Sequence, residues 1–419
     1  MHVRTLLNKL EVYKSFVFCD EHFEETEGSL PSILVNIRPR KGARGQCPEC
    51  GRLCATYDTQ RQRRFEYKPL FEFKVFFVYT PRRVKCPFHG VKVESVPWGS
   101  GKEQMTNSYK HVLSRWAKRL SWQETARIFE TSWDSVYRAV ESVVSYGMQH
   151  QELDDISQIG VDEIAVFRGH KYLSMVYALD EGKRRLLWCG EGRDAKVFRK
   201  FFQDVLGQKR SHDIQYVCSN MWAAYLKVTK EEAPNALNIL DRFHIMKKFN
   251  DAIEQVRRDE YKALKSQGVN NPLIGARWTM VKRPENHTEK QAATMKELLK
   301  HNLKSVKAHL MREEFQRFWS YTYSACALKF MNEWITRTLR GNIEPMKKVA
   351  RMLRRHTDLI MNWFKPKKRL SSGAVEGLNL KAKLVIRKSF GFRSIKCLVV
   401  ALFHTLGNLP EPNRTHRFC

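Results

Sequence analysis

Hydrophobic and polar positions follow different periods in five successive parts of the chain. Residues 1–100 alternate with a period of two, which predicts β-strands, whereas residues 101–150 have helical spacing with one short break, which predicts two helices joined by a turn. Residues 151–259 mix strand-length and helix-length apolar runs, residues 260–365 have helical spacing throughout, and residues 366–419 hold two helices around a Gly-Phe-Arg-Ser turn. The pattern predicts a multidomain protein of mixed α+β and α/β class.

Residues 151–259 carry the most specific pattern of the five. They begin with three strand-length apolar runs separated by turn residues, which predict an antiparallel meander. A helix, a buried strand that ends at Asn220, a second helix, a short strand and a long helix from Phe243 follow. This alternation predicts an α/β layer, and we expect residues 260–365 to interrupt it as an all-helical insertion.

Composition narrows the class of protein. The 74 Lys and Arg residues exceed the 44 Asp and Glu residues, so the net charge of +30 predicts a polyanionic partner. Hydrophobic residues make up 42% of the chain, which argues against a disordered basic tail. No long uncharged apolar run is present and the ten cysteines are unevenly spread, so we expect a cytoplasmic protein with no membrane partner and no disulfide framework.

Two short motifs in the first part predict a metal site. Cys47 and Cys50 form one pair, Cys86 and His89 form another, and each pair has two intervening residues and a following glycine. Three thiolates and one imidazole satisfy tetrahedral zinc, and four protein ligands leave no open position, so we expect structural zinc in a zinc-ribbon domain over residues 1–100. The alternatives are reduced surface cysteines, or a site in which Cys54 replaces one ligand.

The second part, residues 101–150, resembles a helix-turn-helix domain. Ala126 is small where the two helices must approach, and Thr131 or Ser132 can cap the second helix. That helix would enter a major groove, with its first residues near base edges or phosphates: Trp133, Asp134, Ser135 and Arg138. Any helical hairpin with the same apolar spacing looks similar, so the motif alone does not decide between a DNA-binding helix-turn-helix and an ordinary structural hairpin.

Candidate acids occur in the third and fifth parts. Asp162 occupies a polar position inside an apolar strand, where burial of a carboxylate is costly unless a cation or another partner pairs with it. Glu163 is expected on the opposite face of that strand, and Asn220 stands where a second acid would be expected. Glu376 lies in the first turn of a predicted helix, where it either serves a metal or simply complements the helix dipole.

Five motifs in this order, IGVDE, SNMWAAY, LDRFHIMKKFNDA, SSGAVEGLNLKAK and RKSFGFRS, resemble bacterial insertion-sequence transposases of the ISL-three family, which belong to the DDE class. The resemblance implies a ribonuclease-H-like catalytic core over residues 151–259 and 366–419, interrupted by the helical insertion. It implies that Asp162, the position of Asn220 and Glu376 bind two magnesium or manganese ions for strand cleavage and 3′-hydroxyl strand transfer. Asp241 and His244 match a further motif of related families and would position flanking DNA.

Asn220 departs from that family pattern, which has Asp at this position. A carboxamide oxygen is neutral and a weaker magnesium ligand than a carboxylate, so we expect this copy to be impaired or inactive. Two explanations are open: a deliberate substitution that traps a DNA complex, and a degenerate natural copy. The otherwise intact motifs favour the first.

The resemblance also implies the partners. The two N-terminal domains would read the terminal inverted repeats of double-stranded DNA, while basic residues near the C-terminus would hold phosphates of flanking or target DNA without sequence choice: Lys381, Lys383, Arg387, Lys388 and Arg393. A homodimer or larger assembly on DNA and a nucleoid-associated location in a bacterial cytoplasm are expected. The rival functions are a non-catalytic, sequence-specific DNA-binding repressor and a structure-selective nuclease without strand transfer.

Overall fold

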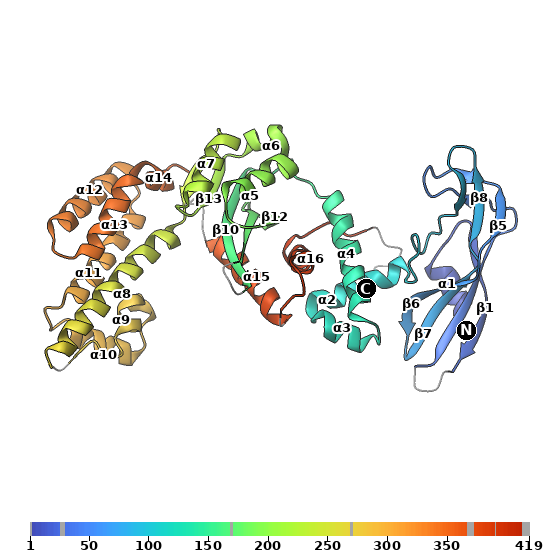
Figure 1. Ribbon diagram of the computed structural model, residues 1–419, viewed down its shortest axis with the longest axis horizontal. Helices are drawn as coiled ribbons and strands as arrows, with labels where there is room; N and C mark the ends of the chain where they lie inside the picture. The colour runs from blue at the N-terminus through green and yellow to red at the C-terminus, as the bar shows by residue number, and fades with distance from the viewer. Residues whose placement is uncertain are drawn as a thin grey trace. The chain divides into compact units, whose positions relative to one another are not determined.

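The structure is a computed structural model that describes residues 2–25, 30–167, 171–268, 271–366, 373–389 and 391–412 (Figure 1). The chain divides into two compact units, one made of residues 1–152 and 382–419 and the other of residues 153–381. Helix α15 (Gly373–Lys388) crosses this division. The expected C-terminal part, residues 366–419, is therefore shared between the two units.

The first unit begins with α1 (Val3–Leu10) and a four-stranded sheet of order β1-β2-β7-β6. The strands are β1 (Phe16–Glu24), β2 (Ser32–Pro39), β6 (Arg63–Leu70) and β7 (Phe73–Tyr79). One face of the sheet is buried around Trp98, whose indole packs edge-on against Phe16 and Tyr79. The strands predicted from the period-two pattern are confirmed, because alternate side chains enter this aromatic core. The pattern did not predict the helix α1 at the start of this part.

Two smaller sheets extend the first unit. One has the order β5-β8-β9, and β3 pairs with β4 in the other. Their strands are β3 (Gly45–Gln46), β4 (Leu53–Cys54), β5 (Thr56–Thr59), β8 (Arg82–Cys86) and β9 (Gly90–Val93). A buried ion pair between Arg82 and Glu94, 2.6 Å apart, lies beside them, and the Tyr79 hydroxyl donates to the same carboxylate at 2.5 Å. Arg82 also donates to the Ala43 carbonyl oxygen, so the pair ties the strand β8 to the chain before β3.

The helices of the first unit are α2 (Asn107–Arg119), α3 (Trp122–Ile128), α4 (Trp133–Gln149) and α16 (Ile395–Leu406). The expected pair joined by a turn is present as α3 and α4, and Ser132 caps α4 as predicted. The expectation of only two helices in this part was wrong, because Ser121 and Glu124 form a capping box that starts α3 separately from α2. The C-terminal α16 belongs to the same unit, with His404 hydrogen-bonded to Ser114 at 2.9 Å.

The second unit contains a five-stranded sheet of order β12-β11-β10-β13-β14. The first three strands along the chain pair antiparallel, and β13 and β14 add parallel to β10. The bounds are β10 (Gln158–Phe167), β11 (Lys171–Ala178), β12 (Arg185–Glu191), β13 (Tyr216–Ser219) and β14 (Leu237–Leu240). The predicted meander and α/β layer are confirmed.

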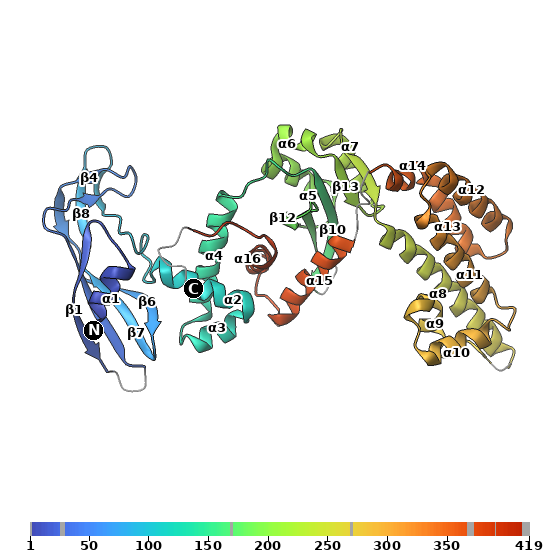
Figure 2. The same ribbon diagram turned by 180° about the vertical axis from the view of Figure 1, so that it is seen from behind.

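Helices cover both faces of this sheet. One face is covered by α5 (Ala195–Lys200), η1 (Phe201–Leu206), α6 (Gly207–Asp213) and α7 (Ala223–Glu232) (Figure 1). Phe198, Phe202 and Tyr225 of these helices are buried in one core cluster with Val161 of the sheet. Helix α15 lies beside β10 on the other face (Figure 2). A Cβ atom on Gly160 would lie 2.5 Å from Cγ2 of Val375, so only glycine permits this close approach of helix and strand.

The long helix α8 (Arg242–Ser266) begins directly after β14 and leads into an all-helical layer. Its other members are α9 (Arg277–Val281), η2 (Pro284–Asn286), α10 (Glu289–Leu298), α11 (Lys304–Gln316), η3 (Arg317–Ser320), α12 (Ser324–Arg340), α13 (Glu344–Arg355), α14 (Thr357–Met361) and η4 (Asn362–Phe364). Phe249, Phe315 and Trp334 lie in its core. The helical spacing predicted for residues 260–365 is confirmed. Across the described ranges, none of the helices is both long and apolar enough to cross a bilayer.

We expect Glu94→Ala to lower the free energy of unfolding of the first unit by about 3–5 kcal/mol, because it leaves the Arg82 guanidinium buried without its partner. Hydrogen–deuterium exchange of the β7–β9 segment in the full-length chain measures the loss. Asp58→Ala is the matched control, since the Asp58–Arg83 pair is half-exposed and its removal should cost less than about 1 kcal/mol. Equal losses in the two variants would contradict the role given to the buried pair.

Candidate active site and candidate metal centre

Three polar residues lie level with one another across the parallel strands of the second unit. The β10–β13 register, continued from the Gly160–Cys218 pair, places Asp162 beside Asn220. The β13–β14 register places Asn220 beside Asp241, which directly follows the last strand. Because neighbouring strands lie about 4.8 Å apart, the three residues form a row at one level of the sheet. The row contains two of the three predicted catalytic positions.

Asp162 is held by α15, which lies on the face of the sheet that α5, α6 and α7 do not cover. The Asn379 side chain donates from Nδ2 to Oδ2 of Asp162 at 2.6 Å, and the buried Tyr177 hydroxyl donates to Oδ1 of Asn379 at 2.7 Å. The tyrosine therefore orients the amide so that its donor faces the carboxylate. Sequence reasoning did not identify Asn379 as a partner of Asp162, because the two residues are 217 positions apart in the chain.

Glu376 precedes Asn379 by three residues, so the two lie on one face of α15, one turn apart. Its side chain is exposed. Apart from the cysteine–histidine group below, no three His, Cys, Asp or Glu ligand atoms in the described part of the chain lie within 4.8 Å of one another. The structure thus brings Asp162, Asn220 and the helix carrying Glu376 to one region. It does not bring the two carboxylates and the amide into a single tight cluster.

His244, in the first turn of α8, lies between the two acids of the row. Its Nε2 atom is 3.7 Å from Oδ1 of Asp162 and 3.8 Å from Oδ2 of Asp241. Burial lowers the pKa of His244, but contact with Asp162 and the charges of Asp241 and Glu163 outweigh that effect, so the net pKa is raised. The predicted pair Asp241 and His244 therefore lies against the first predicted acid. Sequence spacing did not show that contact.

Glu163 was expected to point away from the site, and its contacts show that it reaches the row as well. It accepts a hydrogen bond from Nδ2 of Asn220 at 3.1 Å. Burial, followed by the charge of Asp162, raises the pKa of its carboxyl group. The signal available in the sequence was the second acid of IGVDE, which strand alternation alone assigned to the far face.

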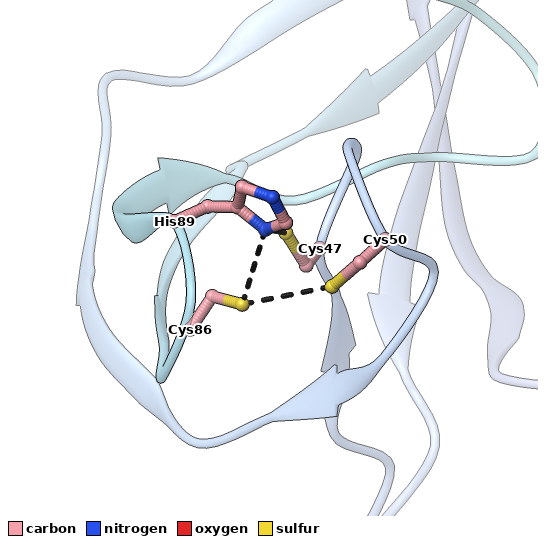
Figure 3. Close-up of side chains that lie close together, drawn as sticks. All are labelled: Cys47, Cys50, Cys86 and His89. Atoms are coloured by element: carbon pink, nitrogen blue, oxygen red, sulfur yellow. Dashed lines mark hydrogen bonds between the residues drawn. The ribbon is translucent and has the colours of Figure 1, made fainter.

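Four side chains of the first unit converge as predicted on one point (Figure 3). Cys47 and Cys50 lie in the turn between β3 and β4, while Cys86 and His89 lie at the turn between β8 and β9. Their ligand atoms are all within 4.8 Å of one another, with Sγ of Cys50 and Cys86 3.6 Å apart. The set of three thiols and an imidazole fits a tetrahedral metal ion.

The backbone around this group permits the two tight turns and favours the thiolate form of Cys86. Gly51 and Gly90 have φ values of +70° and +68°, which permit the tight turn after each ligand pair. Burial by itself raises the pKa of Cys86. Hydrogen bonds from the backbone N–H groups of Phe88 and His89 outweigh that effect and bring the pKa down to about 7. Cys54 packs in the same small core but lies outside the four-residue group, so the alternative in which it replaces a ligand is not supported by this geometry.

The predicted DNA-contacting residues of α4 differ in their exposure. Trp133 is half-buried and stacks on Tyr137, and the Arg393 guanidinium lies 5.5 Å above its ring. Ser135 bonds to the cap residue of its own helix, whereas Arg138 is exposed and pairs with Asp134 at 2.6 Å. Trp133 and Arg393 thus form one cluster although 259 residues separate them in sequence.

The other predicted basic residues lie along α15, and three of them are exposed: Lys381, Lys383 and Arg387. Lys388 is also largely exposed, and it donates to the backbone carbonyl of Arg119. Desolvation lowers the pKa of Lys388. The exposed side chains of the first three are accessible to a ligand, whereas Lys388 also binds the end of α2.

Comparison with known families matches residues 159–402 to a family model described as a transposase, of the ISL-three type and the DDE class. The chain belongs to the ISL-three transposase family. The match covers more than half of the chain and spans the sheet, the helical layer and α15. The predicted family is confirmed.

Individual relatives agree with this family. The chain is 27% identical to the transposase for insertion sequence element IS1557 of Mycobacterium tuberculosis (strain CDC 1551 / Oshkosh), over 97% of this chain and 96% of that one. It is 26% identical to the transposase for insertion sequence element IS1001 of Bordetella parapertussis, over 83% and 85% of the two chains. A solved Drosophila P element transposase strand transfer complex covers 71% of this chain and 90% of that one at 10% identity and a TM-score of 0.38, which is too low to establish a shared fold.

We expect Asn379→Ala to destabilise the second unit of this transposase by about 1–3 kcal/mol, because it removes the acceptor of a buried tyrosine hydroxyl and the donor to Asp162. Urea unfolding of the full-length chain measures the change. Leu380→Ala, at the neighbouring position with its side chain 58% exposed, is the control and should leave stability nearly unchanged. A loss no larger in Asn379→Ala than in the control would show that the amide does not hold α15 on β10.

Proposed function

We propose that this transposase binds the terminal inverted repeats of an insertion sequence and that its site is built for divalent-metal-dependent strand cleavage and 3′-hydroxyl strand transfer. We further propose that Asn220 weakens or abolishes that chemistry in this copy. The observation that carries the proposal is the level row of Asp162 and Asn220 on adjacent parallel strands, with α15 and its Glu376 tied to Asp162 through Asn379.

The fold class that supports this proposal is a ribonuclease-H-like core. Its supports are a three-strand antiparallel meander extended by two parallel strands, helices on both faces of the sheet and a late helix against the first strand. Residues 260–365, from the second half of α8 through η4, would then be the helical insertion. Asp162 on the first strand, position 220 after the fourth and Glu376 on the late helix are the proposed catalytic residues.

The donor chemistry of these residues fits a hard divalent cation, because carboxylate and amide oxygens are the ligands that magnesium and manganese take in proteins. Two such ions, when bound, activate the attacking oxygen and stabilise the leaving one. Asp162 would hold both ions, the residue at position 220 one and Glu376 the other. The Asn379 hydrogen bond to Oδ2 orients the Asp162 carboxylate.

Asn220 is a poor substitute for a carboxylate here for a geometric reason as well as a charge reason. Its Oδ1 already accepts a hydrogen bond from the backbone N–H of Trp222 at 2.8 Å. The atom that faces the acid Glu163 is Nδ2, a donor without a lone pair for a cation. The amide therefore presents the wrong group to the site.

Recognition of DNA would be divided between several parts of the chain. In the first unit, a zinc ribbon formed by the four-ligand group and a helix-turn-helix formed by α3 and α4 would read the terminal repeat, with Trp133, Ser135 and Arg138 near the bases or phosphates. The exposed basic side chains of α15, with Lys388 and Arg393, would contact phosphates, and Asp241 and His244 would position flanking DNA. Pairing of two ends requires a homodimer or a larger assembly.

A non-catalytic repressor of the same lineage is the second candidate, because Asn220 is satisfied by its two hydrogen bonds without any cation. Asp162 and Glu376 would then have no catalytic use. Restoration of the second acid separates the two candidates.

We expect Asn220→Asp to gain magnesium-dependent nicking of duplexes that carry the element ends, by about 100-fold or more over the parent chain, because even residues that only support metal ligands change activity 10- to 100-fold. A gel assay of labelled duplexes in MgCl2 and MnCl2 measures the gain. Asn235→Asp, which adds the same charge at an exposed site in the same unit, should gain nothing. Absence of nicking by Asn220→Asp would refute the catalytic assignment and leave the repressor.

We expect the chain to bind one structural zinc ion, and we expect Cys50→Ser to lose it because three ligands no longer close the tetrahedral shell. Elemental analysis of the purified full-length protein measures the zinc content. The controls are Cys54→Ser, which removes the thiol that packs beside the group, and Cys326→Ser, which removes an exposed thiol. Stoichiometric zinc in Cys50→Ser, or its loss in Cys54→Ser, would overturn this ligand set.

A further inference from the structure

The contact between Asn220 and Glu163 has a defined orientation. A backbone N–H can only donate, so the bond from Trp222 N requires an oxygen at Oδ1 of Asn220. The other terminal atom, Nδ2, is therefore the one that faces Oε2 of Glu163, at 3.1 Å. An aspartate in the same rotamer would keep the Trp222 bond and place its second oxygen where Nδ2 lies.

The spacing at this contact is that of two neighbouring ligands on one small cation. Magnesium binds oxygen at about 2.0–2.1 Å in octahedral geometry, which sets adjacent ligand oxygens about 3 Å apart. The separation of Glu163 Oε2 from the terminal atom of residue 220 has this value. Two anionic oxygens at that distance repel one another unless a cation or a proton lies between them.

Other contacts join Glu163 to the neighbouring residues of the sheet. Its own backbone N–H donates to Oδ1 of Asp162 at 2.9 Å, so the two acids are linked through the strand. Ser174 lies opposite Glu163 on β11, and its hydroxyl bonds to that of Tyr225 at 3.0 Å.

We propose that Glu163 is a further ligand of the divalent cation held at position 220, so that the site has four acidic positions rather than three. In the present chain, the hydrogen bond from Asn220 Nδ2 takes the place of that cation. The proposal rests on the proposed function, because it takes position 220 as the second acid of the catalytic site.

The test is divalent-cation binding by the full-length protein, read from the melting temperature in titrations of MgCl2 and, separately, of MnCl2. We expect no specific shift for the parent chain. We expect a saturable rise for Asn220→Asp, and an apparent affinity about 10- to 100-fold weaker for Asn220→Asp combined with Glu163→Gln. The matched control combines Asn220→Asp with Asp204→Asn, which removes an exposed acid of η1 in the same unit and should keep the full shift.

Glutamine keeps the size of Glu163, and the melting temperature without added metal shows whether the double variant is folded. Isothermal titration with MnCl2 gives the affinity directly if the melting curves of the variants differ. Equal cation affinity in Asn220→Asp with and without Glu163→Gln overturns the proposal, and so does the absence of any cation binding by Asn220→Asp.

The nicking assay separates this proposal from the proposed function. Cation binding that depends on Glu163, without nicking by Asn220→Asp, supports the ligand assignment and refutes the transposase chemistry. Nicking by Asn220→Asp together with cation binding that does not respond to Glu163→Gln supports the catalytic site and removes Glu163 from it. Losses of both binding and nicking on Glu163→Gln support both assignments.

Discussion

A single hydrogen-bond chain, from Tyr177 through Asn379 to Asp162, holds the late helix α15 on the sheet of this transposase. A carboxylate inside an apolar strand needs a partner, and the partner here comes from a helix more than 200 residues later in the chain. The same amide is held by a buried tyrosine on the neighbouring strand, so the helix has one rotation on the sheet rather than several. Glu376 takes its position from that rotation because it lies one turn before Asn379 on the same face.

The close approach of helix and strand depends on a second local feature. Gly160 leaves room for Val375 two residues before the strand carboxylate, and a larger residue would push α15 away from β10. The geometry of the site therefore depends on a missing side chain as well as on those present. Packing permits the contact, and the amide hydrogen bonds select its orientation.

Negative charge is concentrated around Asn220, in the row that it forms with Asp162 and Asp241. Asp162, Glu163 and Asp241 bring three acidic side chains to neighbouring positions, where His244 lies close to two of them and the Asn220 amide contacts the third. An intact second acid would add a fourth negative charge to this group. Carboxylates at such separations repel one another unless a cation or a proton lies between them. The amide removes that requirement, and the site is closed by hydrogen bonds instead.

Sequence reasoning was most successful where the signal is local. Strand and helix periods located the meander, the α/β layer and the all-helical part. The two intervening residues within each of the pairs Cys47–Cys50 and Cys86–His89 predicted that the four side chains converge. Sequence reasoning failed at Ser121, where a capping box starts α3 separately from α2, so that residues 101–150 form three helices and not the expected two. It assigned Glu163 to the opposite face of the strand from Asp162 and did not show that the amide of Asn220 meets the Glu163 carboxylate there.

The sequence by itself determined most of the secondary-structure elements, their order, the predicted metal-ligand pairs and the family. All of these depend on residue spacings over short distances or on the order of motifs along the chain. Only the tertiary structure decided that Asn379 holds Asp162, that His244 lies between two acids and that Asn220 turns its donor toward Glu163. Those contacts join residues from separate strands and helices, and they depend on strand register and helix docking, which are set by the packing of the whole unit.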